Sequence, residues 1–132
     1  MRTLVEKLVE LEREISEERG GFALFALFLR EDAPEKWDLV AAADWFSPDD
    51  KKALDYLEKK VRSRLKPGEM IALSKIALVS HSDASVRAIQ KVISVDHGSV
   101  EVRDSNFFGL AIKHAYIISS KQTKPARSSA GR

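Results

Sequence analysis

Cysteine is absent from this chain of 132 residues, and several kinds of site are excluded with it. Without cysteine there is no disulfide, no thiolate-bound zinc, no cysteine-held iron–sulfur cluster and no thiol nucleophile. Long apolar runs are also missing, since the longest, Phe22 to Leu29, has eight residues, whereas a membrane-spanning helix needs about 20. Residues 1–20 contain no apolar stretch of the kind found in a secretory signal. We therefore expect a cytoplasmic protein without a membrane segment.

Sequence motifs for catalysis and cofactor binding are missing as well. The three histidines, His81, His97 and His114, show no H-x-H or H-E-x-x-H spacing, so no metal site is predicted. Neither glycine-rich phosphate-binding motif is present. Ser80, His114 and Asp44 could be combined into a Ser–His–Asp set, but no G-x-S-x-G turn accompanies them. We expect no cofactor and no metal, and an unidentified enzyme is only the third hypothesis.

The composition is that of one folded domain. Apolar residues make up 44% and charged residues 32%, and 22 basic residues against 20 acidic ones leave a net charge of +2. We predict a single domain over residues 1–120 and a disordered basic tail over residues 121–132. Glu, Lys and Arg dominate the charged residues, and there is a single Asn, which is a composition seen in heat-adapted proteins.

Basic residues are concentrated between Lys51 and Lys66, where seven cations accompany two acids. A basic helix face can bind nucleic acid through phosphate contacts. However, stacking aromatic residues are lacking beyond Tyr56, and the first helix is acidic. Nucleic acid is therefore an unlikely partner, and the basic face is interpreted as solvated.

Apolar periodicity predicts three helices and five strands in the order α-β-β-α-β-α-β-β. The first helix has an apolar stripe at positions 4, 8, 11 and 15 and ends at a glycine pair, and Ser47 is expected to cap the second helix. The predicted helices are 2–19, 48–65 and 83–93, and the predicted strands are 22–30, 37–46, 69–80, 99–104 and 107–119. This pattern predicts an α+β domain with a five-stranded, mainly antiparallel sheet and helices packed on it. The element order is similar to that of profilin-like, roadblock-like and GAF/PAS-like domains, and no functional residue follows from it.

Surplus apolar surface favours a protein-contact function. Val5 and Val9 widen the apolar arc of the first helix, although Glu12 interrupts its wider part. Trp37 and Trp45 share one face of a predicted strand whose centre is made of alanines, and Tyr56 lies away from the apolar stripe of its helix. Our preferred hypothesis is a small non-catalytic domain that acts through protein–protein contacts, as a homodimer. The interface candidates are Val5, Val9, Trp37, Trp45 and Tyr56.

The alternative hypothesis is a regulatory domain that senses a small molecule. His114 is expected within a strand, on the same alternating face as Leu110, Ile112 and Tyr116. The segment 81–97 is expected to lie near this strand and to contribute His81. The pocket candidates are His114, Tyr116 and His81.

Overall fold

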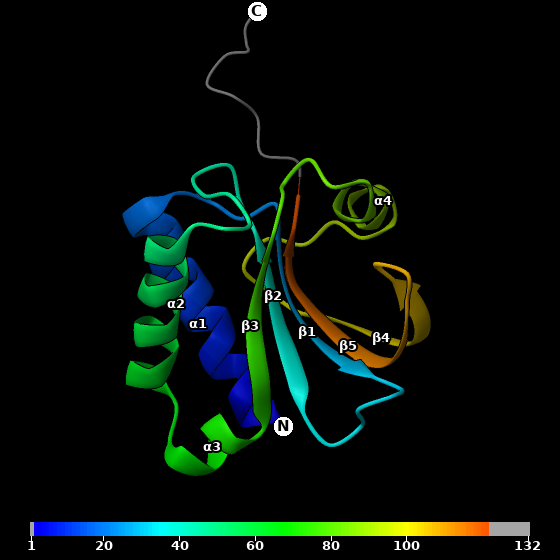
Figure 1. Ribbon diagram of the computed structural model, residues 1–132, viewed down its shortest axis with the longest axis horizontal. Helices are drawn as coiled ribbons and strands as arrows, with labels where there is room; N and C mark the ends of the chain where they lie inside the picture. The colour runs from blue at the N-terminus through cyan, green and yellow to red at the C-terminus, as the bar shows by residue number, and fades with distance from the viewer. Residues whose placement is uncertain (1, 122–132) are drawn as a thin grey trace, which may run out of the picture.

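Within residues 2–121, which the structure describes, five strands form one sheet and four helices pack against it (Figure 1). The structure is a computed structural model. Its helices are α1 (Arg2–Arg19), α2 (Lys51–Arg64), α3 (Pro67–Ile71) and α4 (Ala84–Val92). Its strands are β1 (Leu24–Arg30), β2 (Trp37–Ala42), β3 (Leu73–Val79), β4 (Val100–Phe107) and β5 (Leu110–Ser120). Except for Lys121, the predicted tail lies outside the described residues.

The sheet has the strand order β3-β2-β1-β5-β4. Three neighbouring pairs are antiparallel, whereas β2 and β3 are parallel. A parallel pair needs a long crossover connection, and α2 supplies it between these two strands. The α+β class predicted from the sequence is confirmed, but the sheet is mixed rather than mainly antiparallel.

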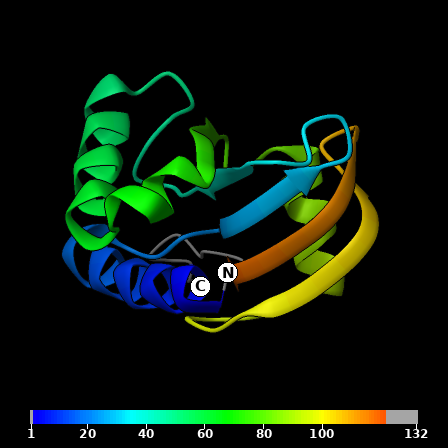
Figure 2. The same ribbon diagram turned by 90° about the horizontal axis from the view of Figure 1, so that it is seen from below.

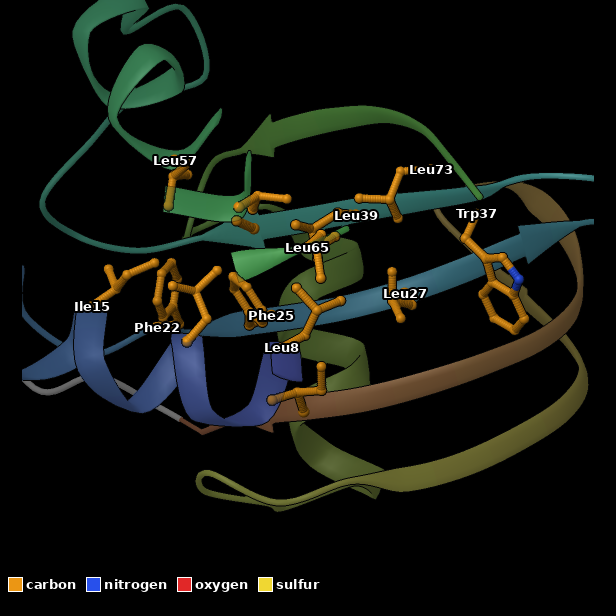
Figure 3. Packing of buried hydrophobic residues seen from close by; sticks show 14 of the residues in the cluster. Leu8, Ile15, Phe22, Phe25, Leu27, Trp37, Leu39, Leu57, Leu65 and Leu73 are labelled. Atoms are coloured by element: carbon orange, nitrogen blue, oxygen red, sulfur yellow. The ribbon is translucent and has the colours of Figure 1, made fainter. Parts of the chain in front are cut away.

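The helices divide between the two faces of the sheet, and Figure 2 shows α1 and α2 on one side of it and α4 on the other. The larger core lies under α1 and α2, where Leu8, Ile15 and Leu57 meet Phe25 of β1 (Figure 3). The predicted stripe of α1 is buried along its whole length. Gly20 follows α1 at a φ of 121°, which places it in the left-handed region as predicted for a helix-ending glycine.

Strand β1 lies at the centre of the sheet, between β2 and β5. Its even-numbered residues, such as Ala26 and Phe28, face the core under α4, and Phe25 and Leu27 face the core under α1. Burial on both faces explains why the strand is apolar throughout, as the sequence predicted. Gln90 of α4 fastens the smaller core by donating hydrogen bonds to the carbonyl oxygens of Ala23 and Lys121, at 3.1 and 2.8 Å.

Several element boundaries differ from the prediction. Strand β2 ends at Ala42, so Trp45 lies beyond it and does not share a strand face with Trp37. The cap of α2 is Asp50 rather than Ser47, because the Asp50 carboxylate accepts the backbone N–H of Ala53 at 3.0 Å. The short helix α3 occupies the start of the predicted strand 69–80, so that β3 begins only at Leu73. Pro67 opens this turn, and the Glu69 side chain accepts the N–H of its cap residue, which favours a helical turn over an extended chain.

Candidate functional site

Three of the predicted site residues meet at one end of the sheet. The ring centroids of His114 and Tyr116, both from β5, are 4.8 Å apart. Trp37, at the start of β2, lies 5.3 Å from His114 and 5.5 Å from Tyr116. These are the spacings of aromatic rings in direct contact, so the rings themselves fill the space between them.

Ile112 does not share the face of His114, contrary to the prediction. In the register with β1, Leu29 pairs with His114 and Arg30 pairs with Ile112, so that Lys113 is an extra residue in β5. Such a bulge shifts the alternation of side chains by one position. Ile112 therefore faces the core under α4, while His114 lies on the side of Trp37 and Tyr116. The predicted neighbour Leu110 is partly exposed, at 40% of its surface.

His114 is held by an acid on the neighbouring strand. Its Nε2 atom lies 2.5 Å from Oε2 of Glu101 in β4, and Arg103 donates to the same oxygen at 2.8 Å. The hydrogen bond from His114 is the main reason that the pKa of Glu101 is lowered, and the positive charge of Arg103 adds to the effect. The Glu101 carboxylate therefore already binds two side chains of its own chain.

The remaining pocket candidate, His81, lies at the opposite end of the sheet. His81 follows β3, whose last residue pairs with the last residue of β2, and that residue pairs with Leu24 of β1. His114 instead pairs with Leu29 of β1. Five residues of strand separate the two levels by about 17 Å. The pocket expected from His114, Tyr116 and His81 together is therefore not assembled, and neither is the Ser80–His114 pair of the Ser–His–Asp set.

Most of the interface candidates are used within the chain. Val5 and Trp37 are buried in the core under α1, at 6% and 9% exposure, and Val9 packs against the same core. Trp45 packs on Tyr56 and donates a hydrogen bond from Nε1 to a carbonyl oxygen at the end of α1, at 3.0 Å. Tyr56 in turn donates to Glu18 at 2.6 Å. These contacts join α1 to the sheet and to α2, and they leave little of these five side chains for a partner.

One cluster of functional groups was not predicted. Glu12 of α1 is fully buried, and its carboxylate lies 2.5 Å from Nδ1 of His97 and accepts a hydrogen bond from Ser16 at 2.9 Å. Nε2 of His97 lies 3.1 Å from Asp96, which also pairs with Lys121. The sequence contained one signal of this cluster, namely Glu12, the acid that interrupts the apolar arc of α1. The cluster joins α1 to the loop before β4 through contacts between its acidic and basic side chains.

The two edge strands of the sheet differ strongly. In the part of the chain that the structure describes, no strand pairs with the outer edge of β3 or of β4. Strand β4 carries three charged residues, and one of them, Asp104, has a φ of 52°, which departs from the extended conformation of a strand. Such features prevent an edge from pairing with another chain. Strand β3 has a single charge, Lys75, and its residues 76–79 are apolar and half-buried.

A cleft lies beside the free edge of β3. It has a volume of about 120 Å³ and is formed by α2, by the end of α3 and by residues 73–76 of β3. Met70, Leu73 and Ile76 provide its apolar surface, and Glu58 and Arg62 of α2 provide its polar rim. Next to it, the side chain of Ile71 is 68% exposed. The free edge of β3 with this cleft, hereafter the β3 groove, is the candidate functional site.

Comparison with known proteins found no matching family model, curated protein or solved structure. Among residues 2–121, no helix combines the length and the apolar character needed to cross a membrane. The same residues contain no group of three or more His, Asp or Glu side chains placed to hold a metal ion.

Proposed function

We propose that this chain is a protein-contact domain that binds an extended segment of a partner along the β3 groove. In this mode of recognition the added segment pairs with the backbone of an edge strand, and pockets beside the strand select side chains. The observation that carries the proposal is the contrast between the two edges. Strand β4 has the charges and the irregular backbone that protect an edge, whereas β3 is apolar and regular beyond Lys75.

The dimensions of the β3 groove support this function. Seven residues of β3 extend for roughly 23 Å and can pair with a segment of similar length. The adjoining cleft accepts one side chain of that segment, and exposed Ile71 adds apolar area at its end. A second copy of this chain can supply the segment through its own β3, which is the homodimer expected from the sequence. An extended segment of another protein can pair with β3 in the same way, because the pairing uses backbone hydrogen bonds.

The alternative, a small-molecule sensor, has less support. The rings of Trp37, His114 and Tyr116 contact one another at the place where the ligand was expected. A ligand would have to separate rings that already stabilise each other by stacking. The β3 groove needs no such rearrangement, which is why we favour protein contact over ligand sensing.

Selection from a phage-displayed library of random nine-residue peptides tests the proposal, with the full chain immobilised. Ile76→Lys places a charge in the middle of β3, and Val102→Lys makes the same change on the other edge strand, where the side chain is also half-buried. We expect the selected peptides to bind Ile76→Lys at least about tenfold more weakly and Val102→Lys as tightly as the unchanged chain. Far-UV circular dichroism must show that both variants are folded. Peptides that bind both variants equally would refute the use of the β3 edge.

A further inference from the structure

We propose that the occupant of the β3 groove is a second copy of this chain, paired antiparallel through its own β3, an inference that rests on the proposed function. Lys75, the single charged residue of β3, lies near its start, and residues 76–79 are apolar and half-buried. Beside the strand, Glu58 and Arg62 balance each other's charge at the cleft. The order of side chains along β3, rather than net charge, therefore decides which segment fits.

The side chains of β3 alternate between the two faces of the sheet. Ile76 and Leu78 pack against the core under α1 and α2, whereas Ala77 and Val79 pack against the core under α4. The alternation places Lys75 on the face of Ala77 and Val79. Residues opposed in an antiparallel pair carry their side chains on the same face. A two-fold axis perpendicular to the sheet meets this condition for two β3 strands, because it keeps the corresponding faces of both copies on the same side.

A register centred on Ala77 pairs apolar residues with apolar residues through the middle of the seam. It sets Ala77 opposite the same residue of the second copy, and Ile76 opposite Leu78 of the second copy. Centring the pair on Ile76 or on Leu78 would instead set one of these two large side chains opposite a serine. Centring it on Lys75 would oppose two like charges, which is destabilising. The pattern of the strand therefore selects Ala77 as the centre.

This register also separates the two lysines. Lys75 lies opposite Val79 of the second copy, so that its aliphatic stem can cover the valine while its ammonium group stays in water. Four residues of strand separate the two copies of Lys75 along the seam, which is about 13 Å. That distance exceeds the Debye length of about 8 Å at physiological ionic strength, so the repulsion between the lysines is largely screened.

The second copy supplies an apolar side chain to the cleft. Ile76 lines the cleft, and in the proposed register Leu78 of the second copy lies opposite Ile76, on the face toward α2. The two-fold axis repeats this contact, so that each copy offers its Leu78 to the cleft of the other. The two five-stranded sheets then join into one continuous sheet, with α1 and α2 of both copies on the same face.

Single introduced thiols test the register, because the chain has no cysteine of its own. Ala77→Cys places two thiols on directly opposed residues, whose Cα separation of about 4.5–5.5 Å suits a disulfide. We expect this variant to form a covalent dimer with oxidised glutathione on a non-reducing gel. Lys75→Cys and Val79→Cys are the matched controls: neither should cross-link alone, and their mixture should. Cross-linking of Lys75→Cys alone, or of none of these samples, would overturn the proposed pairing.

Multi-angle light scattering and sedimentation of the full chain measure the dimer itself. Ile76→Lys should raise its dissociation constant at least about tenfold, and Val102→Lys, on the other edge strand, should leave it unchanged. Far-UV circular dichroism must show that both variants are folded, and the thiol variants test the pairing even where Ile76→Lys unfolds. A dimer that Ile76→Lys leaves intact would overturn the inference, because another surface would then join the copies.

The peptides selected on the immobilised chain separate the inference from the proposed function. A monomeric chain that binds these peptides, and binds them more weakly as Ile76→Lys, would overturn the inference and leave the proposed function intact. A monomeric chain that binds no peptide would refute both.

Discussion

His97→Asn should destabilise the protein strongly, because His97 is the partner of a fully buried acid. Glu12 has no exposed surface, and His97 provides one of its two hydrogen-bonded contacts. Removing one partner of a buried pair costs about 3–5 kcal/mol, since the remaining charge is left uncompensated. The His97 side chain is 26% exposed, so we expect the lower end of this range, about 3 kcal/mol. For a domain of this size that is a fall in Tm of roughly 10 °C.

Asparagine is chosen because His97 has a φ of 56°, and asparagine tolerates this left-handed region while being too short to reach Glu12. Urea denaturation gives the change in the free energy of unfolding. His81→Asn is the matched control, because His81 is exposed and lies in a turn. Adding Glu12→Gln to His97→Asn should recover part of the loss, since an uncharged amide is cheaper to bury. A loss for His97→Asn no larger than that of His81→Asn would refute the reasoning.

Two further predictions concern a glycine and a hydrogen bond. Gly20→Ala should cost more than about 1 kcal/mol, because φ is 121° and the new Cβ would lie 3.2 Å from an indole carbon. At Gly109, φ is 72° and a new Cβ would meet no neighbouring atom within 4 Å, so alanine there should cost only the backbone strain. Equal losses of unfolding free energy for the two variants in urea denaturation would contradict the close contact at Gly20. His114→Gln should bring the lowered pKa of Glu101 up toward its ordinary value of 4.5, as followed by NMR titration. A carboxyl group with a lowered pKa stabilises the fold above its ordinary pKa, and this stabilisation is lost as the pH falls through the lowered value. On acidification below about 4.5 the unchanged chain should therefore lose more stability than the variant. An unchanged pKa of Glu101 in the variant would contradict the role given to His114.

Local sequence was sufficient to predict most of the elements. The stripe of α1 and the glycine at its end depend on side chains within one helix and on the backbone freedom of one residue. The apolar character of β1 on both faces indicated a central strand, and the sheet places it there. The helix of α3 was missed because its capping contact, from Glu69, competes with a strand pattern that is also apolar.

The candidate site depended on contacts that no local pattern contains. His114 and Tyr116 were predicted as neighbours and are in contact, but Trp37 joins them only through the pairing of β2 and β5 with β1. The bulge at Lys113 is decided by the register of two strands far apart in the sequence, so the face of Ile112 could not be predicted. Glu12 and His97 are 85 positions apart, and their pairing requires α1 to lie against the loop before β4.

The sequence by itself determined the class of the fold, the number of strands and the stripe by which α1 is buried, because these follow from residues a few positions apart. Only the tertiary structure decided that β3 and β4 are the edges of the sheet. An edge is defined by the absence of a neighbouring strand, and neighbours are chosen by long-range pairing rather than by local propensity. For the same reason Arg62 of α2 and Ile76 of β3, which no local pattern brings together, came to line one cleft when α2 crossed from β2 to β3.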